Sequence, residues 1–386
     1  MRACIVQNIS LTEHLGLSTY LFNISKNICK FSDLELFVIV SKSKKNLPII
    51  DGDVEIVQID SNTYSIPDNL LFAKQAVHEL IRINKNKPID IIHCVYPFSS
   101  LIAATLFKRR YPAVKLVYDI RSPWIDMSAE RSIMLKRIGR VYKSVTYCIE
   151  KILIDNADGY IFITEGLMNH YANKMRIVDK PYSIVPSGVD LKRFTAKSGK
   201  TIRARYGIRD DDLLLGYVGG IAKIRNLDFV IRGFREALSY RKDLKLMMVG
   251  DGDDLNSLKY MASRMGCSDR IIFTGKVNYD QIPAYISSFD FGLCHLPDKL
   301  IFRYSYPIKI LEYLASGVPV LASNIWSHIE ISKKLNGIII YDDFSSFVSL
   351  LRNIGRNGNL NNKTLVYYDW SNVSLAINSF WHRLIE

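Results

Sequence analysis

Residues 304–322, YSYPIKILEYLASGVPVLA, predict a short loop, a helix and a buried strand. Pro307 suits the first turn of a helix, because the N–H that it lacks would have no partner there. Gly317 stands where a helix ends, since glycine readily adopts the left-handed conformation that closes many helices. The helix gains one apolar face from residues at helical spacing, Ile308, Leu311 and Leu314. The apolar run that follows is typical of a strand covered on both sides: Val318, Val320 and Leu321.

The loop before this helix is a candidate phosphate site. In an α/β sheet, the free N–H groups at a helix N-terminus and the helix dipole both favour an anion. Glu312 lies one turn further along, where its carboxylate could accept hydrogen bonds from the hydroxyls of a ribose. The alternative is a glutamate on a solvated helix face, because charged side chains are mostly exposed.

The stretch resembles the donor-binding segment of family-4 glycosyltransferases, which are retaining enzymes of the GT-B fold. The resemblance implies that Glu312 binds the ribose of a nucleotide sugar and that the preceding loop binds its diphosphate. The candidate donor-binding residues of that loop are Tyr304, Ser305, Tyr306, Pro307, Ile308 and Lys309. Tyr304 stands where the full family pattern has a second glutamate, and the chain is similar to a branch that keeps only the PxKxxEY core.

The length of the chain, 386 residues, predicts two domains, because a single core rarely grows beyond about 250–300 residues. Hydrophobic residues make up 48% of the sequence, which is typical of a globular protein. No apolar run is long enough to predict a membrane span, and the N-terminus predicts a first strand and not a signal peptide. The six cysteines are scattered without a CxxC pair, which predicts buried thiols in a reducing cytosol and no metal site.

Lysine and arginine number 51 against 38 acidic residues, which gives a formal net charge of +13. Such an excess predicts an anionic partner: nucleic acid, an anionic membrane surface or phosphorylated substrates. No nucleic-acid-binding motif is present, so the membrane and the phosphates are preferred. Residues 127–155 predict an amphipathic helix that could lie on an anionic membrane, with a solvated basic face as the alternative. Its basic side consists of Arg131, Lys136, Arg137, Arg140 and Lys143.

The first half of the chain alternates between strands and helices, as in a doubly wound sheet. Residues 3–6 predict the first strand, and Gly16 follows in a turn before a helix over 17–28. This order is typical of a ligand site at the carboxyl edge of a sheet, although a plain turn is equally consistent. In the family that the chain resembles, a glycine-containing loop at this place lies near the diphosphate, which makes Gly16 a candidate. His93, near the end of a strand over 89–96, is expected to be structural.

Residues 114–124, VKLVYDIRSPW, predict a strand whose carboxyl end carries Asp119 and Arg121. Side chains two positions apart on a strand point to the same side, so both could face a ligand. A local ion pair that holds the loop is an equally weighted alternative. The segment resembles the family's strand that carries an acceptor-side catalytic residue, in a branch with a D-x-R-x-x-W pattern. We therefore expect Asp119 and Arg121 either to act in catalysis or to form a structural pair.

The second half begins again with a strand over 212–219, followed by a glycine loop and a helix. In the family, an arginine directly after the first glycine and a lysine five residues later both bind the diphosphate. When the chain is aligned with the family pattern on the following LDFVI, Arg225 stands at the lysine position. We expect Arg225 to bind the diphosphate and assist catalysis. The arginine position holds Gly220, and Lys223 or Lys309 could compensate for the missing cation.

Two further segments resemble parts of the family's donor site. A Gly-Asp-Gly turn at 250–252 is similar to its VGxGP segment, and RIIFTGKV at 270–277 is similar to the segment that meets the nucleobase. These matches complete the candidate donor residues: Gly219, Gly220, Gly250, Thr274, Gly275, Lys276 and Val277. Residues 183–194 resemble the family's crossing between domains, and the last helix is expected to cross back to the first domain. That helix has Val373, Ile377 and Trp381 on one face.

We therefore expect an α/β protein of the GT-B fold, with two doubly wound Rossmann-like domains facing across a cleft. The expected division is an acceptor-binding domain over 1–190, a donor-binding domain over 191–368 and the returning helix over 369–386.

The resemblance implies transfer of a sugar from a UDP- or GDP-type nucleotide sugar to a hydroxyl group with retained configuration, without a cofactor or a bound metal. The expected acceptor is lipid-linked or a saccharide, in bacterial polysaccharide or lipopolysaccharide synthesis. The expected location is cytoplasmic, peripheral at the inner membrane face, with an anionic membrane surface and not nucleic acid as the partner. The alternatives are a non-catalytic nucleotide-sugar-binding subunit and a GT-B-fold sugar-nucleotide epimerase.

Overall fold

The protein divides into two compact units in a computed structural model that describes residues 1–11, 16–31, 34–43, 50, 54–61, 66–96, 98–123, 126, 139–175, 177, 179–195, 199–355 and 363–386. The first unit contains Met1–Ser187, Tyr304–Tyr306 and Trp370–Glu386, and the second contains Gly188–Arg303 and Pro307–Asp369. The first boundary lies close to the predicted one at 190. The assignment of Tyr304–Tyr306 to the first unit differs from the prediction, which placed all of 191–368 in one domain.

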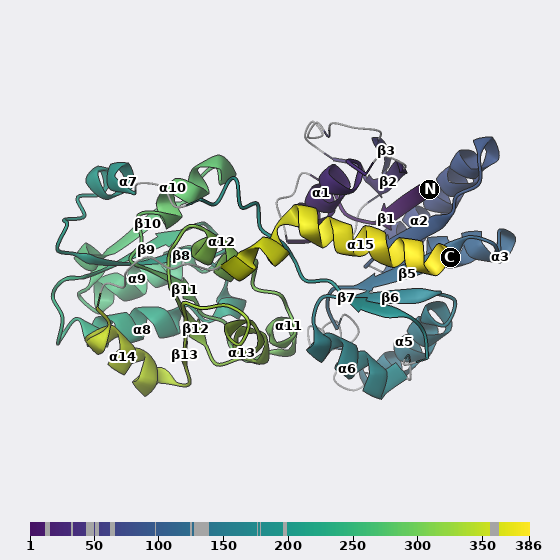
Figure 1. The fold of residues 1–386 in the computed structure, drawn as a ribbon. Helices are drawn as coiled ribbons and strands as arrows, with labels where there is room; N and C mark the ends of the chain where they lie inside the picture. Colours follow the sequence, from purple (N-terminus) through teal and green to yellow (C-terminus); the bar gives the residue numbers. More distant parts are fainter. Residues whose placement is uncertain are drawn as a thin grey trace. The chain divides into compact units, whose positions relative to one another are not determined.

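The first unit is a parallel sheet with helices packed on both faces (Figure 1). In the described residues, seven strands follow the order β3-β2-β1-β4-β5-β6-β7. They are β1 (Arg2–Gln7), β2 (Glu35–Ser41), β3 (Val54–Ile59), β4 (Ile91–Val95), β5 (Lys115–Ile120), β6 (Gly159–Phe162) and β7 (Tyr182–Ile184). The helices are α1 (Gly16–Ile28), α2 (Ile66–Asn86), α3 (Phe98–Arg110), α5 (Gly139–Ile154), α6 (Glu165–Met175) and α15 (Trp370–Ile385).

Continuous apolar runs in the strands explain why helices cover both faces of this sheet. Along β1, Cys4 and Val6 join a buried cluster with residues of α2 and α3. Ala3 and Ile5 point the other way and join a second cluster with residues of α1 and α15. Trp381 of the last helix is fully buried in that second cluster, so α15 covers the first sheet.

The second unit repeats the architecture. Among the described residues, six parallel strands follow the order β10-β9-β8-β11-β12-β13. They are β8 (Leu213–Val218), β9 (Leu244–Val249), β10 (Ile271–Gly275), β11 (Phe291–Cys294), β12 (Val320–Ser323) and β13 (Ile338–Tyr341). The helices are α7 (Lys200–Arg205), α8 (Asp228–Ala237), α9 (Leu255–Arg264), α10 (Ile282–Ile286), α11 (Leu300–Arg303), α12 (Ile308–Ala315), α13 (Trp326–Ser332) and α14 (Phe344–Asn353). Short 3₁₀ turns lie at η2 (Lys223–Arg225), η3 (Ser268–Arg270), η4 (Tyr279–Gln281) and η5 (Lys363–Tyr368).

Residues 304–322 form the predicted helix and strand as α12 and β12. Leu311 and Leu314 are buried as predicted, but Ile308 is only half-buried and the fully buried Ile310 was outside the predicted face. Pro307 is the N-cap residue of α12, one position before the first helical turn. The predicted apolar face is too narrow, because consecutive residues of α12 are buried on most sides of the helix.

The predicted basic helix over 127–155 is described only as α5, from Gly139 onward. The residues Arg131, Lys136 and Arg137 and the side chains of Arg140 and Lys143 lie outside the described part of the chain. No helix within that described part combines the length and the apolar character needed to cross a bilayer.

The six cysteines are free thiols, but the prediction that they are buried is only partly right. Cys148 on α5 is exposed and Cys29 is half-buried, whereas the other four lie in the interior. Cys148 lies on the surface of a helix and Cys29 directly after the end of one. The spacing of cysteines in the sequence does not distinguish such positions from core positions.

Candidate functional site

The order of the second sheet reverses between β8 and β11. In the described structure these two strands pair through two residues only, so their carboxyl ends are not paired with each other. The Tyr313 hydroxyl connects these ends, because it accepts from the Val218 N–H at 2.8 Å and lies 3.4 Å from the Leu293 carbonyl oxygen. Open α/β sheets bind their ligands at such a switch point. Sequence reasoning missed Tyr313, although it directly follows Glu312 in the motif.

Glycines bring the loops after β8, β9 and β10 together at this edge of the sheet. Gly219 and Gly250 have φ angles of 141° and 145°, which side chains other than glycine rarely adopt. A Cβ on Gly250 would lie 2.0 Å from the Gly219 carbonyl oxygen. The Gly250 N–H donates to the Gly275 carbonyl oxygen at 3.0 Å. Three of the predicted donor residues therefore lie in adjacent loops.

The Nζ of Lys309 is a buried cation that forms no ion pair with any described residue. Its Nζ is shielded from solvent, and no acceptor among the described residues forms a hydrogen bond with it. The Nζ lies 4.2 Å from the centre of the Tyr217 ring, and a Cβ on Gly219 would lie 3.1 Å from it. An ammonium group has three donors to satisfy. The arrangement leaves these donors for an anion beside the glycine loop.

The other candidate cations lie in the loop after β8, where Arg225 is half-buried and Lys223 is exposed. Burial raises the pKa of the Cys294 thiol to about 11, while Lys309 and Arg225 act in the opposite direction. Both cations are therefore close enough to the end of β11 to influence one thiol. Of the two lysines considered as replacements for the arginine absent at Gly220, Lys309, whose Nζ is buried beside the glycine loop, fits the role better than the exposed Lys223.

Glu312 is buried, so the alternative of a solvated glutamate is wrong. The Tyr279 hydroxyl donates to its Oε1 at 3.3 Å. Burial raises the pKa of Glu312 to about 7, although Lys309 and the Tyr279 hydroxyl act in the opposite direction. Near neutral pH the side chain therefore exchanges between the acid and the carboxylate.

The raised pKa predicts that the affinity for uridine or guanosine falls as the pH drops from 8 to 6. Only the carboxylate offers both oxygens as acceptors to ribose hydroxyls, and with a pKa of about 7 its population changes about tenfold over this range. Calorimetric titration with nucleosides measures the change without interference from phosphate groups. Glu312→Gln is the matched control, and the same pH dependence in this variant would contradict the assignment.

The predicted nucleobase segment follows β10 at the same edge of the sheet. Gly275 has a φ angle of 71°, and the Thr274 hydroxyl donates to the Gly275 carbonyl oxygen at 2.9 Å. Lys276 is exposed and Val277 is half-buried. Their contact with a base stays a prediction.

The predicted donor residues do not all belong to one unit. Gly16, at the start of α1, and Tyr304–Tyr306 belong to the first unit. The Thr164 hydroxyl donates to the Tyr304 carbonyl oxygen at 3.2 Å, and the His170 ring lies 5.3 Å from the Tyr304 ring. The structure places several candidates of the second unit in adjacent loops, and a donor role for the candidates of either unit stays a prediction.

Asp119 and Arg121 form an ion pair in the interior of the first unit. Arg121 Nε lies 2.9 Å from Asp119 Oδ1, and the two residues are 5% and 0% exposed. Asp119 Oδ2 accepts from the Tyr20 hydroxyl at 2.6 Å and lies 3.1 Å from His93 Nε2. Burial alone would raise the pKa of Asp119, but Arg121, His93 and Tyr20 outweigh it and hold the pKa below its usual value. The structure therefore favours the structural pair over a catalytic role.

His93 connects this pair to the last helix. Trp381 Nε1 donates to His93 Nδ1 at 3.1 Å. An indole nitrogen can only donate, so Nδ1 must accept and the proton must lie on Nε2, which donates to Asp119. His93 is thus a neutral structural histidine, as expected from the sequence.

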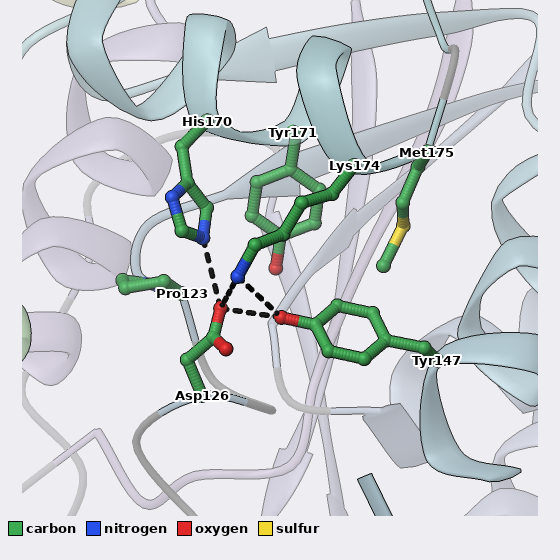
Figure 2. A pocket seen from close by; sticks show the side chains of 7 residues that line it. All are labelled: Pro123, Asp126, Tyr147, His170, Tyr171, Lys174 and Met175. Atoms are coloured by element: carbon green, nitrogen blue, oxygen red, sulfur yellow. Dashed lines mark hydrogen bonds and ion pairs between the residues drawn. The ribbon is translucent and has the colours of Figure 1, made fainter. Parts of the chain in front are cut away.

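A closed polar cluster lines a small pocket of the first unit that has no room for a water molecule (Figure 2). Asp126 Oδ2 accepts from the Tyr147 hydroxyl and from Lys174 Nζ at 2.7 Å, and it lies 2.8 Å from His170 Nε2. Because three donors already surround this oxygen, it is not free to take a ligand. The cluster fixes Asp126, soon after β5, to α5 and α6.

His295 and His328 are buried histidines of the second unit, where an epimerase would need acid–base groups. Burial lowers the pKa of both His295 and His328 to about 4, so both rings are neutral at physiological pH. Among the described residues, no group of three or more His, Cys, Asp or Glu is arranged to hold a metal ion.

The chain belongs to the family-4 glycosyltransferases. Residues 16–193 match the family model described as Glycosyltransferase Family 4, and residues 198–363 match the one described as Glycosyl transferases group 1. These matches confirm the predicted family, and the two parallel Rossmann-like sheets are those of the GT-B fold.

Individual relatives are distant. The chain is 25% identical over 324 residues to the alpha-monoglucosyldiacylglycerol synthase of Streptococcus pneumoniae, covering 81% of this chain and 70% of that protein. Its fold matches a sucrose-phosphate synthase from Thermosynechococcus elongatus with a TM-score of 0.76 and 14% identity, over 100% of this chain and 99% of that one. It also matches the lipopolysaccharide outer core galactosyltransferase WaaB with a TM-score of 0.68 and 16% identity, over 99% of both chains. At these identities the two structures show the fold alone.

Proposed function

We propose that this glycosyltransferase moves a sugar from a nucleoside diphosphate sugar to an acceptor hydroxyl with retained configuration. The observation that carries the proposal is the buried, unpartnered Nζ of Lys309 beside Gly219. A diphosphate there would supply the missing negative charge, and Glu312 would accept the ribose hydroxyls. The donor is of UDP or GDP type and binds without a metal ion.

In the proposed reaction, the bond between the sugar C1 and the β-phosphate oxygen breaks while a bond from C1 to the acceptor oxygen forms on the same face. The hydroxyl proton of the acceptor passes to the departing phosphate oxygen. Negative charge grows on the diphosphate in this step, so Lys309 and Arg225 would stabilise the transition state more than the ground state. Such a step needs no side-chain base, which agrees with the burial of Asp119.

Lys309→Met should lower the affinity for UDP or GDP by ten- to hundredfold, because a lost hydrogen bond to a charged group costs about 1.5–3 kcal/mol. Methionine keeps the apolar stem of the side chain, so the fold should persist. Titration calorimetry with UDP, GDP and the two nucleosides measures the effect. The nucleosides should lose less affinity than the nucleotides, because they are affected only by the rise in the pKa of Glu312 that follows the loss of Lys309. Lys223→Met, at an exposed lysine of the neighbouring loop, is the matched control. An unchanged affinity for UDP and GDP in Lys309→Met would remove Lys309 from the site.

A thermal-shift screen of nucleotide sugars would then identify the donor, since a ligand at 100 times its dissociation constant stabilises a protein by about 2.7 kcal/mol. Turnover with candidate acceptors separates the enzyme from the alternative of a binding subunit. Intact donor affinity without turnover on any acceptor would favour that subunit, which Gly220 and Tyr304 would then explain.

We also propose that the protein works at the anionic cytoplasmic face of a membrane, on a lipid-linked acceptor in cell-surface polysaccharide or lipopolysaccharide synthesis. Apolar residues at helical spacing on α5 are exposed: Val145 (53%), Ile149 (44%) and Ile152 (57%). Such a stripe is typical of helices that lie in the membrane interface. The net charge of +13 would add attraction to anionic lipids. The name of the matched synthase, which refers to a diacylglycerol lipid, supports a lipid acceptor.

The double variant Val145→Asp/Ile149→Asp should reduce sedimentation with anionic liposomes at least about tenfold, because it removes two apolar side chains from the lipid contact and adds like charge. Leu375→Asp, at an exposed leucine of α15, is the matched control and should bind like the wild type. Raising the salt from 0.1 M to 1 M should weaken wild-type binding, because the Debye length shrinks from about 10 Å to 3 Å. Negligible wild-type binding to anionic vesicles at low salt would refute the membrane proposal.

A further inference from the structure

Tyr217 is a fully buried side chain of β8 that contacts both Lys309 and the glycine loop. Lys309 Nζ lies 4.2 Å from the centre of the Tyr217 ring. The Tyr217 hydroxyl donates to the Gly220 carbonyl oxygen at 2.8 Å. One side chain therefore contacts the unpartnered cation and also the residue that stands where the family has an arginine.

An aromatic ring can hold an ammonium group without neutralising it. The electron-rich face of the ring attracts the cation, but the ring offers no conventional hydrogen-bond acceptor to the three N–H donors. A carboxylate in the same place would form an ion pair and cancel the charge. Because Lys309 Nζ has no acceptor among the described residues, the ring fixes its position and leaves its charge available.

The glycine loop lies directly against the ammonium. A Cβ on Gly219 would lie 3.1 Å from Lys309 Nζ and 3.5 Å from the Tyr217 hydroxyl oxygen. A larger residue at this position would therefore cover the cation. The Gly220 carbonyl oxygen is already occupied by the Tyr217 hydroxyl, which reduces its ability to compete with a ligand for the ammonium.

We propose that Tyr217 is a positioning residue for the donor. It holds the Lys309 ammonium next to the glycine loop, where the diphosphate binds, and so takes over part of the task of the arginine absent at Gly220. Tyr217 itself acts through Lys309 and the loop and does not touch the donor. This inference rests on the proposed function, because it assigns the anion to the donor diphosphate.

The position of Lys309 can be tested without any nucleotide. In the wild type, an amine-acylating reagent quantified by mass spectrometry should modify Lys309 at least about tenfold more slowly than the exposed Lys223, because its Nζ is buried. Tyr217→Leu removes both the ring and the hydroxyl and should bring the two rates together. Inorganic pyrophosphate should slow the modification of Lys309 in the wild type and much less in Tyr217→Leu.

Nucleotide binding then tests whether the placement of the Lys309 ammonium by Tyr217 supports binding of the diphosphate. Tyr217→Leu should lower the affinity for UDP or GDP about tenfold, because the contact between an aromatic ring and a desolvated cation has about this worth. The nucleosides should lose less affinity, because they are affected only through the pKa of Glu312. Tyr217→Phe keeps the ring, loses only the hydrogen bond to Gly220, and should show a smaller loss. Tyr285→Phe is the matched control, because Tyr285 is another buried tyrosine of this unit with one hydroxyl partner.

The outcomes separate the two proposals. Rapid modification of Lys309 in the wild type, or unchanged UDP and GDP affinities in Tyr217→Leu, would overturn the role of Tyr217. If the wild type binds neither nucleotide, the proposed function fails. The modification rates and the pyrophosphate protection then still decide whether Tyr217 holds Lys309 for an anion.

Discussion

Replacing Asp119 by alanine should lower the free energy of unfolding by about 3–5 kcal/mol, because the variant leaves a guanidinium buried without its anion. Arg121 is 5% exposed, and without Asp119 its guanidinium would keep the hydrogen bond from Nη1 to the Val185 carbonyl oxygen and the contact with the Tyr20 ring, neither of which supplies a negative charge. The Tyr20 hydroxyl would lose its acceptor as well. Urea unfolding, monitored by hydrogen exchange in peptides of the first unit, measures the loss of stability in the unit that contains Asp119.

Asp228→Ala is the matched control for this experiment, since it removes a surface ion pair with Arg232 whose side chains are 32% and 50% exposed. It should cost less than about 1 kcal/mol. The pKa of Asp119 is lowered in the folded protein, so its contribution is present above about pH 4 and disappears as the pH falls through the folded-state value. Wild type and variant should therefore converge in acid. A stable Asp119→Ala protein that has lost turnover would instead restore the catalytic assignment.

Trp381→Ala should also lower the free energy of unfolding by about 3–5 kcal/mol, because it empties a large site in a close-packed core. Trp381 is fully buried, and its ring packs edge-on against the His93 ring with centroids 5.5 Å apart. The variant also leaves His93 Nδ1 without a donor. The same exchange experiment should show the loss in α15 and in the strands of the first sheet.

Leu375→Ala is the control on the same helix, because Leu375 is 47% exposed and its truncation should cost within about 0.5 kcal/mol. Trp381→Phe separates packing from hydrogen bonding, since it keeps most of the ring and should cost about 1–3 kcal/mol for the unpaired nitrogen. A Trp381→Ala protein as stable as the wild type would mean that α15 does not hold the first unit together.

Much of the fold could be predicted from local patterns. The strand predicted over 3–6 is β1 (Arg2–Gln7), and the helix predicted over 17–28 is α1 (Gly16–Ile28). The face of the last helix with Trp381 is also buried as predicted. These predictions depend on residues a few positions apart, whose periodicity fixes which side of an element is apolar.

The predictions that missed depended on distant partners. Cys148 was expected in the interior and is exposed, while Glu312 had an open alternative until its burial excluded a solvated position. The pairing of Asp119 with His93 and Tyr20 joins residues 26 and 99 positions apart. No local spacing specifies such contacts, because they arise only when several elements pack together.

The sequence alone determined that the chain has two doubly wound sheets and that it resembles family-4 glycosyltransferases. It also provided the candidate donor residues, at 16, 219–225, 250, 274–277 and 304–312. Only the tertiary structure showed that Lys309 Nζ is buried over the Tyr217 ring with no acceptor among the described residues, whereas Asp119 lies beside Arg121, Tyr20 and His93. The physical reason is that a motif records which charged groups are present. Whether a charge is neutralised within the protein or left for a ligand depends on the neighbours that folding brings to it, 92 positions away for Tyr217 and Lys309 and 288 for His93 and Trp381.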